Sequence, residues 1–297
     1  MVVAAKSPES RPLAAIVWLA SYPRSGNTWT RNFLHNLITL VQGGEAATQD
    51  INAMGRLTTW EIAGHWYEPA LGKPPKLATR MEIARVRPAV QARIASSVDK
   101  LIFVKTHHAL VAEQGFPTIN MKVTAGAIYI VRNPLDVAVS LQHHFGIELH
   151  RAIERLNLVD YTIPPGESSA SEVYGSWAQN VESWTAKPHR AVYVMRYEDM
   201  LDKPTETFGK LATHLLLEHT PAQLEQAIEL SSFDRLKAQE QEKGFRERPK
   251  KSEAFFREGR AEQWRDVLSP DQVRVIIRHN RRTMARFGYI PDDYATP

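Results

Sequence analysis

Residues 16–29 read IVWLASYPRSGNTW, an apolar run that enters a polar loop and then a new segment. The run is continuously apolar up to Ala20, which is typical of a strand covered on both faces in a parallel sheet. The segment Thr28–Val41 carries apolar residues at helical spacing. A buried strand joined directly to a helix by a short loop therefore predicts an α/β fold.

Three more apolar runs continue this pattern and predict strands at Leu101–Val104, Ala127–Val131 and Ala191–Met195. Asn133-Pro134 is typical of a helix start, and residues 270–288 predict a basic helix. We expect one α/β domain with a central parallel sheet flanked by helices and a P-loop-like phosphate-binding strand–loop–helix. Residues 42–98, with helices around their turns, and residues 146–172 are expected to form loops and caps over the carboxyl edge of the sheet.

Composition limits the class of protein. With 43% hydrophobic and 24% charged residues, the 297-residue chain is globular rather than disordered, and no apolar run reaches the length of a membrane span. The absence of cysteine excludes disulfides and thiolate chemistry and fits a cytoplasmic location. A net charge of only +4 argues against nucleic acid as a partner. Residues 1–12 are expected to be a flexible tail and 13–297 the folded domain.

The loop after the first strand has the features of an anion site. A helix start presents unpaired N–H groups and a positive dipole end. Gly26 lets the backbone approach a ligand, Ser25, Asn27 and Thr28 add short donors, and Arg24 adds a cation. An ordinary strand-to-helix turn is the alternative. The nucleoside-triphosphate P-loop pattern is missing, so a metal-free anion site is favoured.

Two further strand ends carry basic side chains instead of a magnesium-binding Asp. Lys105 and His107 are two residues apart, so they face the same way, about 6.6 Å apart along the strand. The lysine suits a leaving oxygen and the histidine suits a general base, whereas neighbouring His108 is expected to be structural. Arg132 and Ser140 follow the next strand and are candidates for gripping a second phosphate.

These motifs together resemble those of sulfotransferases that use 3′-phosphoadenosine 5′-phosphosulfate (PAPS), particularly the cytosolic type. Residues 22–29 are similar to the family's YPKSGTTW loop, residues 105–107 to its KTH, and residues 132–140 to its RNPxDVAVS. Residues 255–259 with Trp264 resemble its FxRKG…GDW element. The resemblance covers about residues 16–268 and implies a sulfotransferase domain.

The resemblance also implies roles for individual residues, with PAPS as co-substrate and no metal. His107 is the implied base, with Lys105 and Arg24 stabilising the transferring group. The implied 3′-phosphate contacts are Arg132, Ser140, Arg257 and Gly259. The remaining implied cofactor-binding residues are Ser25, Gly26, Asn27, Thr28, Trp29, Tyr197, Ser231, Phe233, Phe255 and Phe256.

Several positions depart from the family pattern. Arg24 replaces a lysine, Glu258 replaces a cation beside the expected 3′-phosphate, with Arg260 as a neighbouring substitute, and residues 262–263 replace a Gly-Asp pair. The family's dimer signature KxxxTVxxxE would fall on residues 265–274 and is missing, which leaves the oligomeric state open. Dimerisation by that route is not expected.

The expected partner is a small acceptor with a hydroxyl or amine group. Aromatic side chains in or beside the two capping stretches predict an apolar or aromatic acceptor, with core packing as the alternative for them: Trp60, Trp66, Tyr67, Phe145 and Tyr161. The pair His143-His144 is assigned to packing or the pocket rim. Two other functions stay open, a metal-dependent P-loop-type nucleotide kinase and a non-catalytic adenosine-bisphosphate-binding protein.

Overall fold

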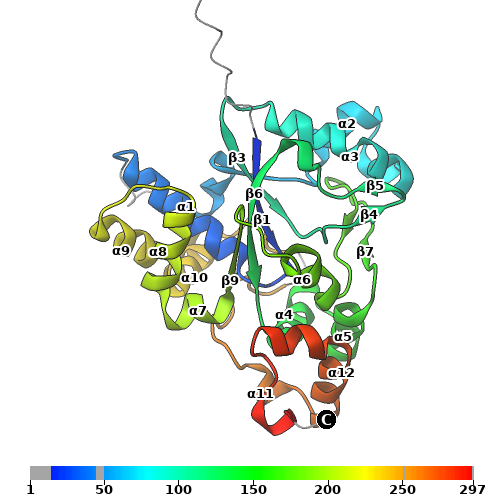
Figure 1. The fold of residues 1–297 in the computed structure, drawn as a ribbon, viewed down its shortest axis with the longest axis vertical. Coiled ribbons are helices and arrows are strands. Elements are labelled where there is room, and N and C mark those ends of the chain that lie inside the picture. The colour runs from blue at the N-terminus through cyan, green and yellow to red at the C-terminus, as the bar shows by residue number, and fades with distance from the viewer. Residues whose placement is uncertain (1–14, 45–49, 250–251, 296–297) are drawn as a thin grey trace, which may run out of the picture.

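The computed structural model describes residues 15–44, 50–249 and 252–295. The expected tail, residues 1–12, lies outside these ranges. A five-stranded sheet forms the centre of the molecule (Figure 1), in the order β2-β3-β1-β6-β9, with all neighbouring strands parallel. Its strands are β1 (Ala15–Ser21), β2 (Thr58–Trp60), β3 (Leu101–Thr106), β6 (Thr124–Val131) and β9 (Val192–Arg196). The predicted α/β class and parallel sheet are confirmed.

Four of the five strands were predicted, with ends that differ from the observed ones by at most three residues. Strand β2 was not, because three residues are too few to show a hydrophobic period. It pairs with β3 at the edge of the sheet, where Trp60 lies opposite Lys105. Two short hairpins lie outside the main sheet, β4 (Ala112–Glu113) with β5 (Phe116–Pro117) and β7 (Thr162–Ile163) with β8 (Glu172–Val173).

Helices cover both faces of the sheet, as expected for continuously apolar strands (Figure 1). In β1, Trp18 points to one core and Leu19 to the other. The first core includes residues of α2 (Gly64–Leu71), α3 (Arg80–Ala95), α4 (Pro134–Phe145), α5 (Leu149–Asn157), α6 (Trp177–Thr185), α11 (Trp264–Val267) and α12 (Pro270–Arg286). The second includes residues of α1 (Asn27–Val41), α7 (Tyr197–Asp202), α8 (Pro204–His214) and α9 (Pro221–Leu230).

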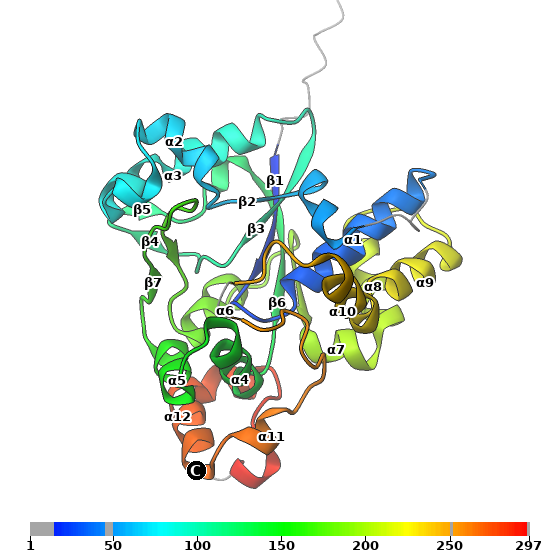
Figure 2. The same cartoon turned by 180° about the vertical axis from the view of Figure 1, so that it is seen from behind.

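Helix α10 (Phe233–Lys243) belongs to a small separate core that also holds Phe245 and Phe256. The chain then runs across the carboxyl end of the sheet before it reaches α11 (orange in Figure 2). Short 3₁₀ turns lie at Ile51–Arg56, Pro75–Leu77, Met121–Val123 and Asp292–Tyr294. The basic helix predicted for residues 270–288 is α12.

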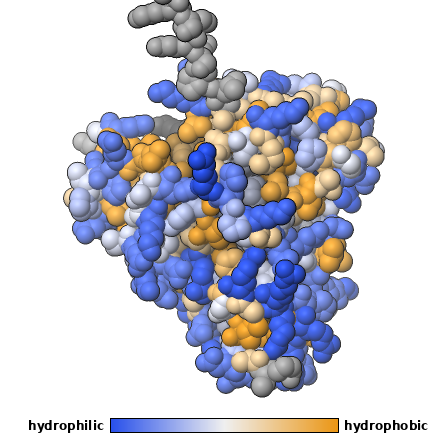
Figure 3. All heavy atoms as spheres, viewed as in Figure 1, coloured by the Kyte–Doolittle hydropathy of each residue, from blue (hydrophilic) through white to orange (hydrophobic). Residues whose placement is uncertain are grey.

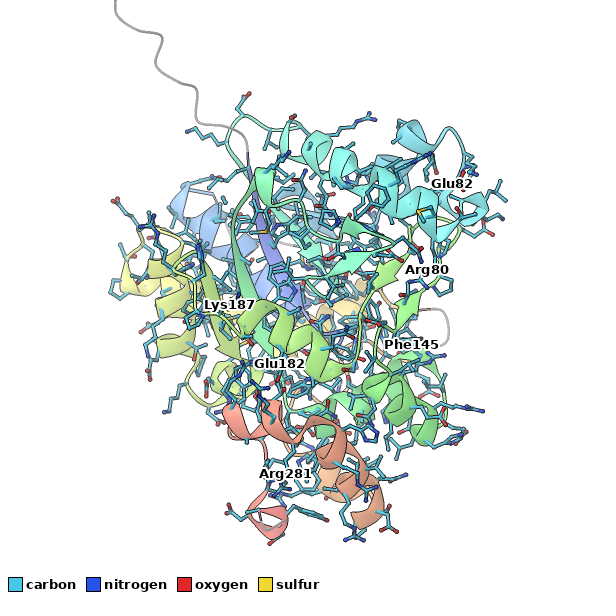
Figure 4. All side chains as sticks on the ribbon, turned by 45° about the vertical axis from the view of Figure 1, so that its right-hand side comes forward. Arg80, Glu82, Phe145, Glu182, Lys187 and Arg281 are labelled. Atoms are coloured by element: carbon cyan, nitrogen blue, oxygen red, sulfur yellow. The ribbon has the colours of Figure 1, made fainter. Side chains whose placement is uncertain are left out.

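Local capping explains where several helices begin. Asn133 accepts a hydrogen bond from the backbone N–H of Leu135 and Pro134 takes the first position of α4, as predicted. Helix α3 begins with a capping box between Thr79 and Glu82, and Glu82 lies at that end of the helix in Figure 4. Helix α1 begins instead at Gly26 without a side-chain cap and without an acidic residue in its first turn.

Polar residues cover much of the surface, with apolar residues scattered among them on the face in Figure 3. Within the described residues, no helix is both long enough and apolar enough to cross a membrane.

Candidate functional site

A cavity of about 430 Å³ lies at the carboxyl edge of the sheet. Every strand of the sheet delivers a residue to its wall at or just after its last residue, because parallel strands end on the same side. These residues are Trp60 at the end of β2, Lys105 near the end of β3 and His107 just after it, Arg24 after β1, Arg132 after β6 and Tyr197 after β9. The chain between α10 and α11 closes another side with Phe255, Phe256, Arg257 and Gly259.

The loop between β1 and α1 brings backbone against the cavity. Gly26 has φ 101°, and a Cβ there would lie 2.8 Å from the ring of Tyr197, so only glycine fits. Since α1 has no side-chain cap, the N–H groups of its first turn remain available to a ligand. Asn27, Thr28 and Trp29 line the cavity beside them. An uncapped helix start of this kind is suited to bind an anion.

Arg24 is held by several groups at the cavity wall. Its guanidinium donates to Ser140 Oγ at 3.0 Å, to His144 Nδ1 at 3.2 Å and to the carbonyl oxygen of Phe255 at 3.2 Å. It also lies 4.5 Å from the centre of the Phe255 ring. Burial and then the positive charge of Arg132 lower the pKa of Arg24 to about 10. The arginine is still a cation at neutral pH.

His144 is neutral, because its Nδ1 accepts a hydrogen bond from Arg24 and because burial, followed by the charges of Arg24 and Lys105, lowers its pKa to about 3. His143 also lines the cavity. The assignment of this pair to the pocket rim is therefore confirmed.

Arg132 joins two walls of the cavity. It donates to the carbonyl oxygen of Arg24 at 3.0 Å, and its guanidinium lies 4.2 Å from the centre of the Tyr197 ring. Its Nε is buried and has no hydrogen-bond partner within the described part of the chain. A buried cation with an unused donor is suited to bind an anion.

Lys105 contacts two groups that its local sequence does not indicate. Its ammonium nitrogen lies 3.1 Å from Glu247 Oε2 and 4.6 Å from the centre of the Trp60 ring. Both terminal nitrogens (Nη1 and Nη2) of the Arg31 guanidinium in turn donate to Glu247 at 2.7 Å. Burial lowers the pKa of Lys105, whereas Glu247 opposes that shift.

His107 lines the cavity with its ring in a defined protonation state. Its Nδ1 lies 2.9 Å from the carbonyl oxygen of Ser21. Because a carbonyl can only accept, Nδ1 carries the proton and Nε2 has the free lone pair. Burial, followed by the charge of Lys105, lowers the pKa of His107 well below 6.5, so the ring is neutral at pH 7. A neutral imidazole in a polar cavity can accept a proton.

The backbone of His107 is fixed from the opposite side. Its N–H donates to Glu172 Oε1 at 2.7 Å, and the ring of Tyr174 packs edge-on at 5.9 Å from the imidazole. Burial raises the pKa of Glu172. Neither Glu172 nor Tyr174 was predicted, because both come from a stretch without a recognisable motif.

His108 points away from the cavity into a buried polar cluster. Its Nδ1 accepts from the N–H of Val173 at 3.0 Å, and its Nε2 donates to Glu61 at 3.1 Å. Burial raises the pKa of Glu61, but His108 and Arg87 outweigh it and bring the value to about 2. The packing role expected for His108 fits this placement.

The segment after α10 that forms one cavity wall contains positions that depart from the family pattern, Glu258 and residues 262–263. Arg257 lines the cavity but pairs with Glu258 at 2.8 Å and with the side-chain oxygen of Gln263. Arg260 pairs with Glu258 and Asp266 at 2.8 Å and is not among the lining residues, so it does not replace the missing cation. Glu262, which stands where the family pattern has glycine, has φ 61°, a conformation that favours glycine.

Most of the predicted cofactor-binding residues are brought together at this cavity. Two are not part of its lining within the described residues: Ser25, whose hydroxyl is buried without a partner, and Ser231, whose hydroxyl donates to the carbonyl oxygen of Ala227 at 2.5 Å. Gly259 fits tightly, since a Cβ there would lie 2.2 Å from the ring of Phe233.

The expected aromatic wall is only partly present. Trp60 and Phe145 line the cavity, and Phe145 lies at the carboxyl end of α4 in Figure 4. Tyr67 is fully buried and donates to Glu61 at 2.5 Å, so its core alternative is correct. Trp66 and Tyr161 are not among the lining residues, and no described residue of 146–172 is.

Comparison with known proteins identifies relatives of the whole domain. Residues 15–288 match the family model of the sulfotransferase domain. The chain is 25% identical to a flavonol 3-sulfotransferase of Flaveria bidentis over 88% of this chain and 78% of the relative. It is 30% identical to cytosolic sulfotransferase 13 of Arabidopsis thaliana over 48% and 46%. Retinol dehydratase, solved with androsterone and the inactive cofactor PAP, superposes with a TM-score of 0.63 and 19% identity over 96% of this chain and 83% of that one.

Proposed function

The chain belongs to the sulfotransferase family, and we propose that it transfers a sulfuryl group from PAPS to a hydroxyl group of a small acceptor, with His107 as the general base. Transfer to an amine group in place of the hydroxyl group is the alternative form of the same reaction. The family match favours neither the kinase nor the purely binding alternative.

The observation that carries the proposal is the convergence of one neutral histidine and several cations on a single cavity. His107, Lys105, Arg24, Arg132 and Arg257 come from four separate parts of the chain and all line it. Cations around a developing negative charge, with a base beside them, suit the transfer of an anionic group.

The residues present fit a nucleotide with two phosphate groups. The first turn of α1 and Gly26 offer backbone N–H groups on one side, and Arg132 offers an unpartnered buried Nε on another. The cavity also has an aromatic surface against which the nucleobase can pack, formed by Trp29, Tyr197 and Phe233. PAPS, when bound, supplies the sulfur centre that the acceptor oxygen attacks and the bridging phosphate oxygen that leaves with the electron pair.

The chain's residues handle the proton and the charge. His107 Nε2 takes the proton from the acceptor hydroxyl as its oxygen attacks, while the Ser21 carbonyl keeps Nδ1 protonated and the ring oriented. Lys105 and Arg24 stabilise the negative charge that grows on the sulfuryl and leaving oxygens.

An apolar or aromatic acceptor is supported by Trp60, Phe145 and Tyr174 on the cavity wall. A flavonol is an aromatic phenol, so the relative named as a flavonol 3-sulfotransferase also supports an aromatic acceptor. A cytoplasmic location is part of the proposal and is supported by the relative named as a cytosolic sulfotransferase.

The test is sulfation of a panel of phenols and alcohols with PAPS, detected by the mass of the product, for the parent protein and His107→Ala. One positioned base contributes about 10²–10⁴-fold, so turnover of His107→Ala should fall by that factor. Its affinity for PAP, measured by calorimetry, should stay close to the parent's. His150→Ala, at an exposed position of α5, is the matched control. Loss of both turnover and PAP binding in His107→Ala would show that His107 is structural.

A further inference from the structure

Glu247 is a carboxylate in a cavity that otherwise gathers positive charge for an anion. It lies between α10 and α11 and touches both the cavity and its basic residues. Its Oε2 is 3.1 Å from the Lys105 nitrogen and 2.7 Å from Arg31 Nη2, while its Oε1 is 2.7 Å from Arg31 Nη1. By itself, a negative charge at this place would repel an anionic donor, so its presence calls for a structural explanation.

Arg31 explains why the carboxylate stays in place. The arginine side chain is only 4% exposed and also donates to Thr28 Oγ1 at 3.2 Å. A fork-to-fork pair with a buried guanidinium has fixed geometry. Removing one partner would leave a buried charge unpaired, which is strongly unfavourable. The pair with Arg31 therefore holds Glu247 in place beside Lys105.

The ammonium of Lys105 is held on two sides by these contacts. Glu247 takes one of its three N–H donors, and the ring of Trp60 lies against another side at 4.6 Å. The remaining side is the one by which Lys105 lines the cavity. Without the carboxylate, a long lysine side chain would lose most of this restraint.

We infer that Glu247 is a positioning residue for the transfer reaction: anchored by Arg31, it holds the Lys105 ammonium charged and directed into the cavity. The inference rests on the proposed function. It assigns a role to a carboxylate that has no part in binding the donor, and it makes Arg31 the anchor of that role.

The charge of Lys105 depends on groups from several elements. Arg31 on α1, His107 after β3, His144 on α4 and Glu172 on β8 all lie near it, besides Glu247. Burial lowers the pKa of Lys105 most, Glu247 raises it, and Arg31 lowers it. The two members of the ion pair therefore act on the pKa of Lys105 with opposite signs.

The experiment compares Glu247→Gln, Glu247→Asp and Arg31→Gln with the parent. Glu247→Gln should lower kcat by about 10- to 150-fold, the factor that corresponds to losing a hydrogen bond to a charged group, with PAP affinity nearly unchanged. In the pH profile of kcat/KM, the decline at high pH reports deprotonation of Lys105 in the free enzyme. This decline (the alkaline limb) should move to lower pH in Glu247→Gln and to higher pH in Arg31→Gln. Glu247→Asp keeps the negative charge, so its alkaline limb should return to the pH of the parent. Glu253→Gln, an exposed carboxylate of the same segment, is the matched control.

A second measurement does not need turnover. Competitive labelling of amines with isotopic acetic anhydride, read by mass spectrometry, gives the pKa of Lys105 against Lys187, an exposed lysine just after α6 (Figure 4). The pKa of Lys105 should fall in Glu247→Gln and rise in Arg31→Gln. If the parent fails to transfer sulfuryl groups, the proposed function fails while labelling still decides the role of Glu247. Unchanged labelling and an unchanged alkaline limb, with lower thermal stability alone, would overturn the inference and leave Glu247 as a structural anchor. If Glu247→Gln does not fold, Arg31→Gln decides the same question: removing the anchor of Glu247 should lower kcat while PAP affinity stays nearly unchanged, and an unchanged kcat would overturn the inference.

Discussion

Gly259 offers a test in which the expected magnitude comes from the structure itself. Its φ is 63°, and a Cβ would lie 2.2–2.7 Å from three atoms of the Phe233 ring. Gly259→Ala therefore carries two penalties. A left-handed conformation costs a non-glycine residue about 1–2 kcal/mol, and overpacking costs about 1–3 kcal/mol. The free energy of unfolding should fall by about 2–5 kcal/mol.

The same change should weaken nucleotide binding, because the ring of Phe233 must leave its place on the cavity wall. Stacking of a base on an aromatic ring contributes about 1–3 kcal/mol, so PAP affinity should fall about 5- to 150-fold. Urea unfolding and calorimetry with PAP measure the two effects separately.

Gly72→Ala is the matched control for backbone strain. Gly72 has φ 68°, and apart from its own chain neighbours no atom of the described residues lies within 4 Å of the place that a Cβ would take. The residue ends α2 outside the cavity lining. Gly72→Ala should lose only about 1–2 kcal/mol and keep the parent's PAP affinity. Equal stability and equal PAP affinity in the two alanine variants would refute the reasoning, since the contact with Phe233 would then cost nothing.

Two more predictions concern Arg132 and His107. Arg132→Met should lower PAP affinity about 10- to 150-fold, the value of charge-assisted hydrogen bonds of about 1.5–3 kcal/mol, and unchanged affinity by calorimetry would contradict its role. Because the pKa of His107 is lowered well below 6.5 by burial and by Lys105, the base stays neutral as the pH falls to 6.5. The kcat/KM for the donor should thus be level between pH 8 and about 6.5 and decline only below, and a midpoint of the acid limb at or above 6.5 would be inconsistent with this state of the ring.

Sequence reasoning predicted side chains that line one cavity where their positions follow from local order along the chain. The loop after β1, the pair Lys105 and His107, and Arg132 each lie within two or three residues of a strand end. Parallel strands bring their carboxyl ends to one edge, so three local motifs were enough to predict one shared site. The continuous apolar runs predicted helices on both faces for the same reason.

The remainder depends on contacts between distant parts of the chain. Glu247 is 142 positions from Lys105 and 216 from Arg31, and the stretch around it has no period or motif that indicates an inward-facing carboxylate. The direction of Ser231 is a similar case, because a hydroxyl next to a predicted contact can equally bind its own helix backbone.

The amino-acid order by itself determined the parallel sheet and the group of basic side chains at its carboxyl edge, because hydrophobic period and strand ends are local properties. Only the tertiary structure decided which nitrogen of His107 is free and what holds Lys105. Those states are set by the Ser21 carbonyl and the Glu247 carboxylate, and a hydrogen bond across such a separation depends on packing that no short stretch of sequence encodes.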